Sequence, residues 1–262
     1  MGIINITNDS FYEKSRFVEL DKIMKKSEQM LIAGASIIDI GAISSRQYNG
    51  NIIPHKQISS QQEIDRLLPV CEKIKSSLDI HISVDTQRPL VMQECLKAGA
   101  TLINDINSLQ AHSSLDIIAK SRAYVCLMHK EKQLKDANDK TFDIVDDVTT
   151  FLKNRAATCI KAGISKDRII VDPGFGFDKD LSDNLKLLKH LEKIVSLGYP
   201  VLIGISRKSM FSVALDLPID DRLMPSVSIA TYCMHKGASV IRTHDVEQTI
   251  PSLNFINLID AS

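Results

Sequence analysis

The sequence lacks the features of a membrane or secreted protein. No apolar run approaches the roughly 18 residues of a membrane-spanning helix. The amino terminus does not show the charged and then apolar segments of a signal peptide. Met1-Gly2 does not begin a myristoylation signal, because Ile6 stands where Ser or Thr is required. We therefore expect a cytoplasmic protein with no membrane partner.

An excess of either charge is also missing. Lys and Arg together number 32, and so do Asp and Glu, which makes the net charge zero. No overall positive field then attracts nucleic acid or an anionic membrane, and any cationic site must be local. We expect no nucleic-acid partner.

Closely spaced cysteines are absent as well. The five cysteines, Cys71, Cys95, Cys126, Cys159 and Cys233, are odd in number, and none forms a Cys-x-x-Cys pair. This spacing argues against a structural zinc site and against a disulfide framework. We predict reduced and mostly buried thiols.

The chain does contain eight short apolar runs, each of which has a polar residue at or near its end. The runs span residues 3–6, 36–41, 81–86, 101–106, 124–129, 168–174, 201–206 and 239–245. Their ends supply Asn5, Asp39, Asp85, Asn104, His129, Asp172, Arg207 with Lys208, and Arg242 with His244. Polar residues that recur where buried strands leave the core are typical of a (β/α)8 barrel, whose active site is built from the carboxyl ends of its strands.

Segments with helical periodicity lie between these runs. They cover residues 18–34, 61–78, 88–98, 113–121, 143–163, 181–197, 222–236 and 246–260. Regular alternation of strands and helices predicts a parallel sheet. The length of 262 residues is close to that of a typical barrel. We predict an α/β fold, a (β/α)8 TIM barrel that spans residues 1–262 as a single domain, with a surface loop at 130–142.

The first predicted strand follows Met1 directly. Two interpretations of this start stay open. Either loops close the floor of the barrel, or the chain is the C-terminal part of a longer polypeptide.

Four of the polar strand ends are basic. Arg207, Lys208, Arg242 and His244 follow the seventh and eighth runs, where barrels often hold a phosphate group. Guanidinium groups bind phosphate oxygens through pairs of hydrogen bonds. Four cationic groups at adjacent strand ends therefore predict a shared anion. The alternative is that they form exposed ion pairs of little energetic consequence.

Two acidic strand ends, Asp85 and Asp172, are flanked by apolar residues, and we expect them inside the mouth of the barrel. A buried, ionised carboxylate is costly unless it is paired. Each carboxylate therefore needs a ligand or a protein partner. The alternative to a ligand is that both carboxylates only pair with Lys208 or Arg242 to hold the barrel mouth together.

A planar heterocycle would suit these acidic residues. A ring N–H beside an exocyclic amino group offers two parallel donors to Asp172, and Asn104 can both donate and accept. Lys208 could reach a carbonyl oxygen on the same ring, while Met128 and Phe177 would contact its faces. The pattern predicts recognition of a 2-amino-4-oxo-pyrimidine edge, such as a pterin or guanine presents.

In their order and spacing, several stretches of the chain resemble the dihydropteroate synthases, a folate-pathway family of the pterin-binding barrel superfamily. The stretches are GIINITNDSF (2–11), DIGAISSR (39–46), SVDT (83–86), IND (103–105), MH (128–129), DPGFGF (172–177), GISRKS (204–209) and RTHD (242–245). GISRKS and RTHD are the most specific of them.

The resemblance implies a reaction. The family condenses 6-hydroxymethyl-7,8-dihydropterin pyrophosphate with p-aminobenzoate, giving 7,8-dihydropteroate and pyrophosphate, and uses Mg2+ as cofactor. It also implies two small-molecule substrates, a homodimer formed through helices away from the site, and an enzyme that sulfonamides target. Pyrophosphate would leave first and the amine would attack the resulting dihydropterin cation, so no strong general base is required.

By the same resemblance, the site residues take roles. The pterin would be bound by Asp85, Asn104, Ile106, Met128, Asp172, Phe177, Gly204 and Lys208. Pyrophosphate would be bound by Asn5, Ser45, Arg242 and His244, with Asn5 also ligating Mg2+. p-Aminobenzoate would be bound by Phe11, Ser45, Arg46, Lys208 and Ser209. The catalytic residues would be Asp85, Lys208 and Arg242, with Asp85 stabilising the cation.

The chain departs from the family pattern in its loops. Asn8, Glu13, Ala42, Ile43, Gln47 and Asp178 stand where the family usually has Pro, Asp, Gly, Glu, Pro and Gly. Most of these changes touch the loops that would cover p-aminobenzoate. We expect residues 8–16 and 43–52 to be weakly ordered without ligand, and Phe11 to close over the p-aminobenzoate ring.

Two further functions stay open at this point. One is a pterin-binding module that has lost amine transfer, which the altered loops favour. The other is a methyltetrahydrofolate–corrinoid methyltransferase, which shares the barrel and the pterin site. The second is disfavoured because a methyl donor carries no pyrophosphate for the Ser-Arg-Lys and Arg-Thr-His motifs to bind.

Overall fold

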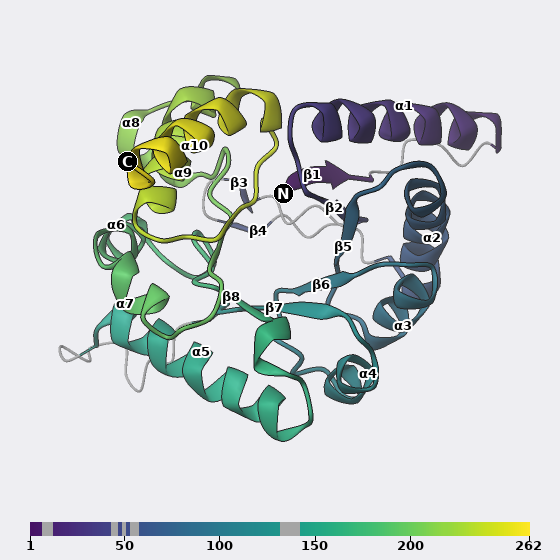
Figure 1. Cartoon of the computed structure of the whole chain (residues 1–262), viewed down its shortest axis with the longest axis horizontal. Coiled ribbons are helices and arrows are strands. Elements are labelled where there is room, and N and C mark those ends of the chain that lie inside the picture. The colour runs from purple at the N-terminus through teal and green to yellow at the C-terminus, as the bar shows by residue number, and fades with distance from the viewer. Residues whose placement is uncertain (7–12, 43–46, 49–50, 53–57, 132–141) are drawn as a thin grey trace.

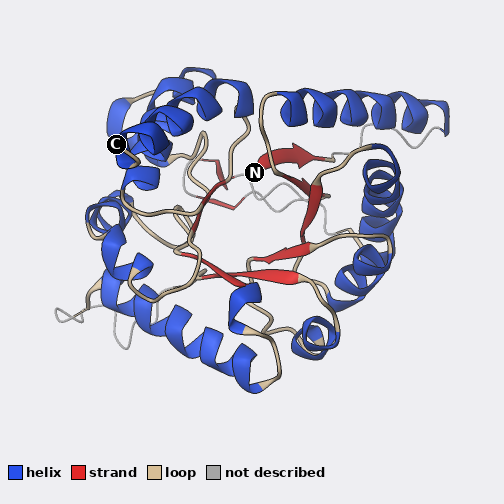
Figure 2. Ribbon diagram, in the orientation of Figure 1, coloured by secondary structure: helices blue, strands red, loops and turns tan. Residues whose placement is uncertain are grey.

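The computed structural model describes residues 1–6, 13–42, 47–48, 51–52, 58–131 and 142–262. Parallel strands form a central ring, and helices surround it (Figures 1 and 2). The ring strands are β1 (Gly2–Asn5), β2 (Ile37–Gly41), β5 (His81–Asp85), β6 (Leu102–Asp105), β7 (Tyr124–Met128), β8 (Ile169–Asp172), β9 (Leu202–Ile203) and β10 (Val240–Ile241). Each falls on one of the eight apolar runs, with β1 beginning one residue before its run, which confirms the predicted barrel.

Two isolated bridges complete the ring. The strands β1-β2-β5-β6-β7-β8 form one sheet in that order, and β9 pairs with β10 in a second. Val171 bridges Val201, and Gly2 bridges Thr243, both in parallel. The Ile3 amide also donates to the Thr243 carbonyl oxygen at 2.9 Å. The segment after β10 therefore packs beside β1. This segment joins the group of strand ends that the earlier strands form.

The helices cover the outside of the ring (Figure 2). They are α1 (Glu13–Ile32), α2 (Ser60–Ser77), α3 (Pro89–Lys97), α4 (Ser114–Lys120), α5 (Ile144–Lys161), α6 (Leu181–Lys189), α7 (Leu191–Val195), α8 (Met210–Leu215), α9 (Leu223–His235) and α10 (Val246–Asp260), with short 3₁₀ turns η1 (Lys166–Arg168) and η2 (Ile219–Arg222). Their apolar faces pack on the outward-facing Val, Ile and Leu side chains of the strands. This packing forms the larger part of the core.

The boundaries differ from the prediction in four places. The single helix expected at 181–197 is two helices, because His190 between them has φ −110° and ψ 29°. Helix α1 begins at Glu13, before the predicted start at residue 18, so the last four residues of the 8–16 segment belong to it. The hairpin β3–β4 (Gln47–Tyr48 and Asn51–Ile52) and helix α8 were not predicted. Both are too short to show a hydrophobic period.

All five cysteines are buried and free of disulfides, which confirms the prediction for the thiols. Burial raises the pKa of the Cys95 thiol to about 12 and that of Cys71 to about 11, so these thiols stay protonated at neutral pH. Among the described helices, none combines the length and apolarity needed to cross a membrane. Most of the predicted 130–142 loop falls in 132–141, outside the described residues.

Candidate active site

The strand register brings the predicted strand ends together at one end of the barrel. Asn5 pairs with Gly41, Gly41 with Asp85, and Asp85 with Asn104. Met128 pairs with Asp172 in the same way. Asn104 is in register with Cys126 and Ile170, so Met128 and Asp172 lie two residues further along β7 and β8. Because residues two apart on a strand point to the same face, these positions share one face near the carboxyl ends of the strands. The register thus places Asn5, Asp85, Asn104 and Asp172 near the carboxyl ends of their strands.

Arg242 connects three parts of this region. Its Nε donates to Asp39 Oδ2 at 2.6 Å, and its Nη2 donates to Asp85 Oδ2 at 3.0 Å. For Asp85, the structure thus shows the alternative that the sequence left open, a carboxylate paired with a cation of the same chain. Burial raises the pKa of Asp85 to about 7, while the positive charge of Arg242 opposes that rise. Burial therefore makes Asp85 easier to protonate than an exposed carboxylate, and the ion pair with Arg242 favours its charged form.

Asp172 lies inside the barrel mouth, only 6% exposed. Its Oδ1 accepts a hydrogen bond from the Gly174 amide at 2.7 Å. A Cβ atom on Gly204 would lie 3.9 Å from Asp172 Oδ2 and equally far from Arg242 Cδ. The bare backbone at Gly204 therefore leaves space between these two side chains. Burial raises the pKa of Asp172, and attraction to Lys208 works against the rise.

Lys208 lies near Asp172 and beside the Phe177 ring. Its Nζ donates to the Phe175 carbonyl oxygen and lies 4.6 Å from the centre of the Phe177 ring. Burial lowers the pKa of Lys208 to about 8, although the nearby Asp172 favours the charged form. A cation held by a carbonyl and an aromatic face is positioned to meet a ligand oxygen. Lys208 and Asp172 lie close enough for their charges to interact, and their role toward a ligand stays a prediction.

Arg207 does not join this group. Its Nε and Nη2 each donate to one carboxylate oxygen of Asp245 at 2.8 Å. The Arg207 backbone has φ 56° and its amide donates to Ser226 Oγ at 2.9 Å. The prediction of four cationic groups around one anion is wrong for this residue, because a local carboxylate takes its charge. Arg207 instead fixes the turn that presents Lys208.

His244 is not cationic either. Its Nδ1 lies 3.1 Å from Ser206 Oγ. Burial and the neighbouring Arg242 lower its pKa to about 4, so the imidazole is neutral at neutral pH. In this structure His244 therefore adds no charge to the basic group, and its neutral ring offers a hydrogen bond.

His129, another polar strand end, points away from the barrel mouth. Its Nε2 lies 3.1 Å from Asp147 Oδ2, and its ring packs edge-on to Phe151, both on α5. Burial lowers the pKa of His129 to about 3. This histidine connects β7 to its covering helix and takes no part in the site.

Sequence reasoning missed one buried lysine beside the site. Lys179 Nζ donates to the carbonyl oxygens of His129, Gly174 and Phe177 at 3.0–3.1 Å. It ties the end of β7 to the loop after β8, which carries Asp172 at its start. A lysine in a polar stretch is normally exposed, and no periodicity distinguishes this one.

Some of the other predicted site residues lie outside the part of the chain that the structure describes. Phe11, Ser45 and Arg46 lie outside it, as do Asn8 and Ile43 of the altered loops. Ile106 follows β6 and Ser209 precedes α8, both half-buried. Asn5 ends β1 and is exposed.

One altered loop position can be explained by its backbone. Asp178 has φ 44°, the left-handed region in which glycine is favoured. Asp and Asn tolerate that region better than other residues with a side chain. The replacement of the family's usual glycine by Asp178 therefore keeps the turn.

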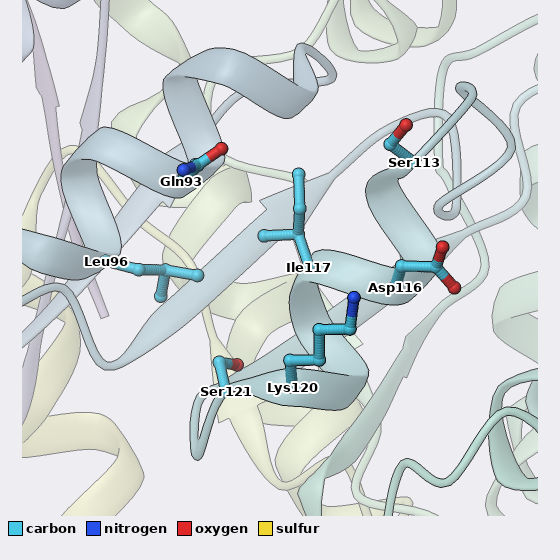
Figure 3. A pocket seen from close by; sticks show the side chains of 7 residues that line it. All are labelled: Gln93, Leu96, Ser113, Asp116, Ile117, Lys120 and Ser121. Carbon is cyan, nitrogen blue, oxygen red and sulfur yellow. The ribbon is translucent and has the colours of Figure 1, made fainter.

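A separate hollow lies on the outside of the barrel, between α3 and α4 (Figure 3). It has a volume of about 480 Å³ and is lined by Gln93, Leu96, Ser113, Asp116, Ile117, Lys120 and Ser121. These residues belong to the helical ring, so the hollow is not part of the strand-end layer.

Comparison with known proteins agrees with this geometry. Residues 1–244 match the family model described as pterin binding enzyme. Dihydropteroate synthase of Haemophilus influenzae is 42% identical to the chain over 251 residues, which is 95% of the chain and 89% of that protein.

Solved structures give the same result. The Yersinia pestis dihydropteroate synthase in a sulfonamide drug complex has a TM-score of 0.88 and 38% identity, over 100% of this chain and 94% of that one. The Xanthomonas albilineans enzyme in complex with 7,8-dihydropteroate has a TM-score of 0.85 and 32% identity, over 100% of this chain and 92% of that one.

Proposed function

The chain belongs to the dihydropteroate synthase family of pterin-binding enzymes, and we propose that the residues at its strand ends carry out the family's reaction. The reaction condenses 6-hydroxymethyl-7,8-dihydropterin pyrophosphate with p-aminobenzoate and yields 7,8-dihydropteroate and pyrophosphate. The observation that carries this assignment of residues is the convergence of Asp172, Lys208 and the Arg242–Asp85 pair at one end of the barrel. A methyltransferase would not need the buried guanidinium at this place.

The pterin ring would occupy the space that Gly204 leaves beside Asp172. Asp172 would accept hydrogen bonds from the ring N–H and the amino group, and Lys208 would donate a hydrogen bond to the ring carbonyl oxygen. Met128 is 3% exposed at the end of β7, and the Phe177 ring lies beside Lys208. Together with Ile106 they would contact the faces of the ring, and Asn104 would hold its mixed edge.

The leaving group would lie above Arg242. Pyrophosphate departs only when its developing charge is neutralised. The Arg242 guanidinium, which is partly exposed beside Asp85, would supply the positive charge. His244, being neutral, would contribute a hydrogen bond rather than a charge. Ser45 would complete this subsite.

Mg2+ would bind here mainly through the phosphate groups of the substrate. The described residues hold no cluster of three His, Cys, Asp or Glu side chains that could bind a metal. Mg2+ often uses one or two protein oxygens together with substrate phosphates, and the exposed amide of Asn5 at the end of β1 is one such oxygen. Asn5 would hold the ion, which would neutralise charge on the pyrophosphate.

Asp85 would act on the pterin after pyrophosphate leaves. The exocyclic carbon then carries positive charge, and an ionised Asp85 stabilises it. The amine of p-aminobenzoate attacks this carbon, with Lys208 and Ser209 at the rim of its site. Phe11, Ser45 and Arg46 would complete the amine site, and the same site would bind sulfonamides.

The direct test is pyrophosphate release. Incubation with the pterin pyrophosphate, Mg2+ and p-aminobenzoate is expected to release pyrophosphate and form dihydropteroate, while omission of the amine stops product formation. Because pyrophosphate and pterin complete the amine site, p-aminobenzoate alone should show no heat of binding in calorimetry. Binding of the pterin pyrophosphate without any product would instead identify a pterin-binding module.

The rate should depend on pH in a bell shape. Asp85 must be ionised and has a pKa of about 7, and Lys208 must be protonated and has a pKa of about 8. kcat/KM for the pterin pyrophosphate should therefore fall as the pH drops below about 7 and again as it rises above about 8. A steady-state profile from about pH 5.5 to 9.5 measures both limbs. A profile that is flat across this range would contradict the roles of both residues.

The surface of α8, α9 and α10 supports the proposed homodimer. These helices lie together on one side of the barrel (Figure 1). Several large apolar side chains on them are exposed by 65–71%, namely Val213, Met224, Phe255 and Leu258. Large apolar side chains exposed on neighbouring helices favour a protein contact.

Charged substitutions on this surface should separate the dimer. The double variant Phe255→Glu/Leu258→Glu is expected to elute as a monomer in size-exclusion chromatography with light scattering, because two charges would be buried in the contact. Ile160→Glu, on α5, changes a side chain that is 41% exposed and serves as the control. If the wild type, the double variant and the Ile160→Glu control all elute as dimers, the interface lies elsewhere.

A further inference from the structure

Asp39, at the centre of β2, collects donors from three other strand segments. Its side chain is fully buried. Oδ1 accepts from Ser83 Oγ at 2.5 Å. Oδ2 accepts from Arg242 Nε at 2.6 Å and from Asn104 Nδ2 at 3.4 Å. One carboxylate thus lies beneath both a proposed pterin contact, Asn104, and the proposed pyrophosphate contact, Arg242.

This arrangement determines how Arg242 presents its guanidinium. The group is planar and has five N–H donors in a rigid fork. Asp39 takes the Nε side and Asp85 takes a donor of Nη2. Two anchor points on a planar group fix its plane, and the side chain is still 19% exposed.

We propose that Asp39 is a positioning residue, which holds the Nε side of Arg242 so that the guanidinium presents its outer edge to the pyrophosphate and divides its charge between Asp39 and Asp85. The proposal rests on the proposed function of this site. It assigns to Asp39 no contact with either substrate.

The charges around Asp85 make the proposal testable through pH. Asp85 is faced by Arg242, Asp39, Asp105 and Glu63, and the charge of Lys208 is also close. Among the carboxylates, Asp39 contributes the largest rise to the pKa of Asp85. Removing the charge of Asp39 should therefore lower the pKa of Asp85, because Arg242 would then act on Asp85 alone.

The experiment compares Asp39→Asn with Ser83→Ala. Asp39→Asn keeps the shape but removes the charge, and Arg242 retains Asp85 as a partner, so we expect the variant to fold. The preference for the pyrophosphorylated pterin over bare hydroxymethyl pterin should fall by about tenfold or more, while the affinity for the bare pterin changes less than about threefold. The acidic limb of the kcat/KM profile should move to lower pH by about half a unit or more.

Ser83→Ala is the matched control because it removes a neutral contact of Asp39 and keeps the charge. Its acidic limb should stay in place even if its thermal midpoint falls. If Asp39→Asn loses stability but keeps both the wild-type limb and the wild-type preference for the pyrophosphate, Asp39 is only structural and the proposal is overturned. Equal losses for the two pterins would overturn it too.

A second variant covers the case in which Asp39→Asn does not fold. Arg242→Lys keeps the charge but lacks the planar fork that spans Asp39 and Asp85. It should lose the preference for the pyrophosphorylated pterin by about tenfold, and a wild-type preference would overturn the positioning role. Failure of the wild-type protein to release pyrophosphate with both substrates is a different outcome, which rejects the proposed function itself.

Discussion

Asp172→Ala is expected to abolish pterin binding while the barrel stays folded. Asp172 is nearly fully buried beside Gly204, and its proposed partners are the ring N–H and the amino group. Without the carboxylate, both donors of a buried ring go unpaired, which costs about 1–3 kcal/mol for each group. The loss also removes the opposite charge near Lys208. Together these effects predict a fall in affinity of about a hundredfold or more.

Isothermal calorimetry with hydroxymethyl pterin measures this loss, and circular dichroism checks the fold. Asp167→Ala is the matched control, since Asp167 lies in η1 and is exposed. The control should bind the pterin as the wild type does. Binding by Asp172→Ala within about threefold of the wild type would show that the pterin lies elsewhere.

Arg242→Ala should have two large effects, one on ligand choice and one on stability. The variant loses the charge-assisted contacts to pyrophosphate, each of which contributes about 1.5–3 kcal/mol. The pyrophosphorylated pterin should therefore bind at least about tenfold more weakly than to the wild type, whereas the bare hydroxymethyl pterin should be little affected. The variant also leaves Asp39 and Asp85 without their cation, and breaking a buried pair in this way costs about 3–5 kcal/mol.

Comparison with neighbouring variants identifies the contact. His244→Ala should weaken the pyrophosphorylated pterin by less than Arg242→Ala does, because a neutral hydrogen bond contributes only about 0.5–1.5 kcal/mol. Lys208→Ala should weaken both ligands, since Lys208 faces the ring. Binding is measured below the unfolding temperature of each variant. Equal losses of the two ligands in Arg242→Ala would show that the pyrophosphate does not lie at Arg242.

Sequence alone determined the eight strands, the order of the helices and the layer of polar strand ends. These features depend on local periodicity, because an apolar run followed by a polar residue describes a buried strand wherever it lies in the chain. Parallel register then brings Asn5, Asp85 and Asn104 to one edge without further information. The motifs around Asp172 and Lys208 further predicted the class of ligand, a pterin.

Only the tertiary structure decided which charges meet. Arg242 and Asp39 are 203 residues apart in the chain, yet they form a 2.6 Å ion pair because the segment after β10 closes the ring against β1. Arg207 is taken by Asp245, and burial makes His244 neutral. A residue's type indicates that it can carry charge. Its partner and its desolvation depend on long-range contacts, which no local pattern contains.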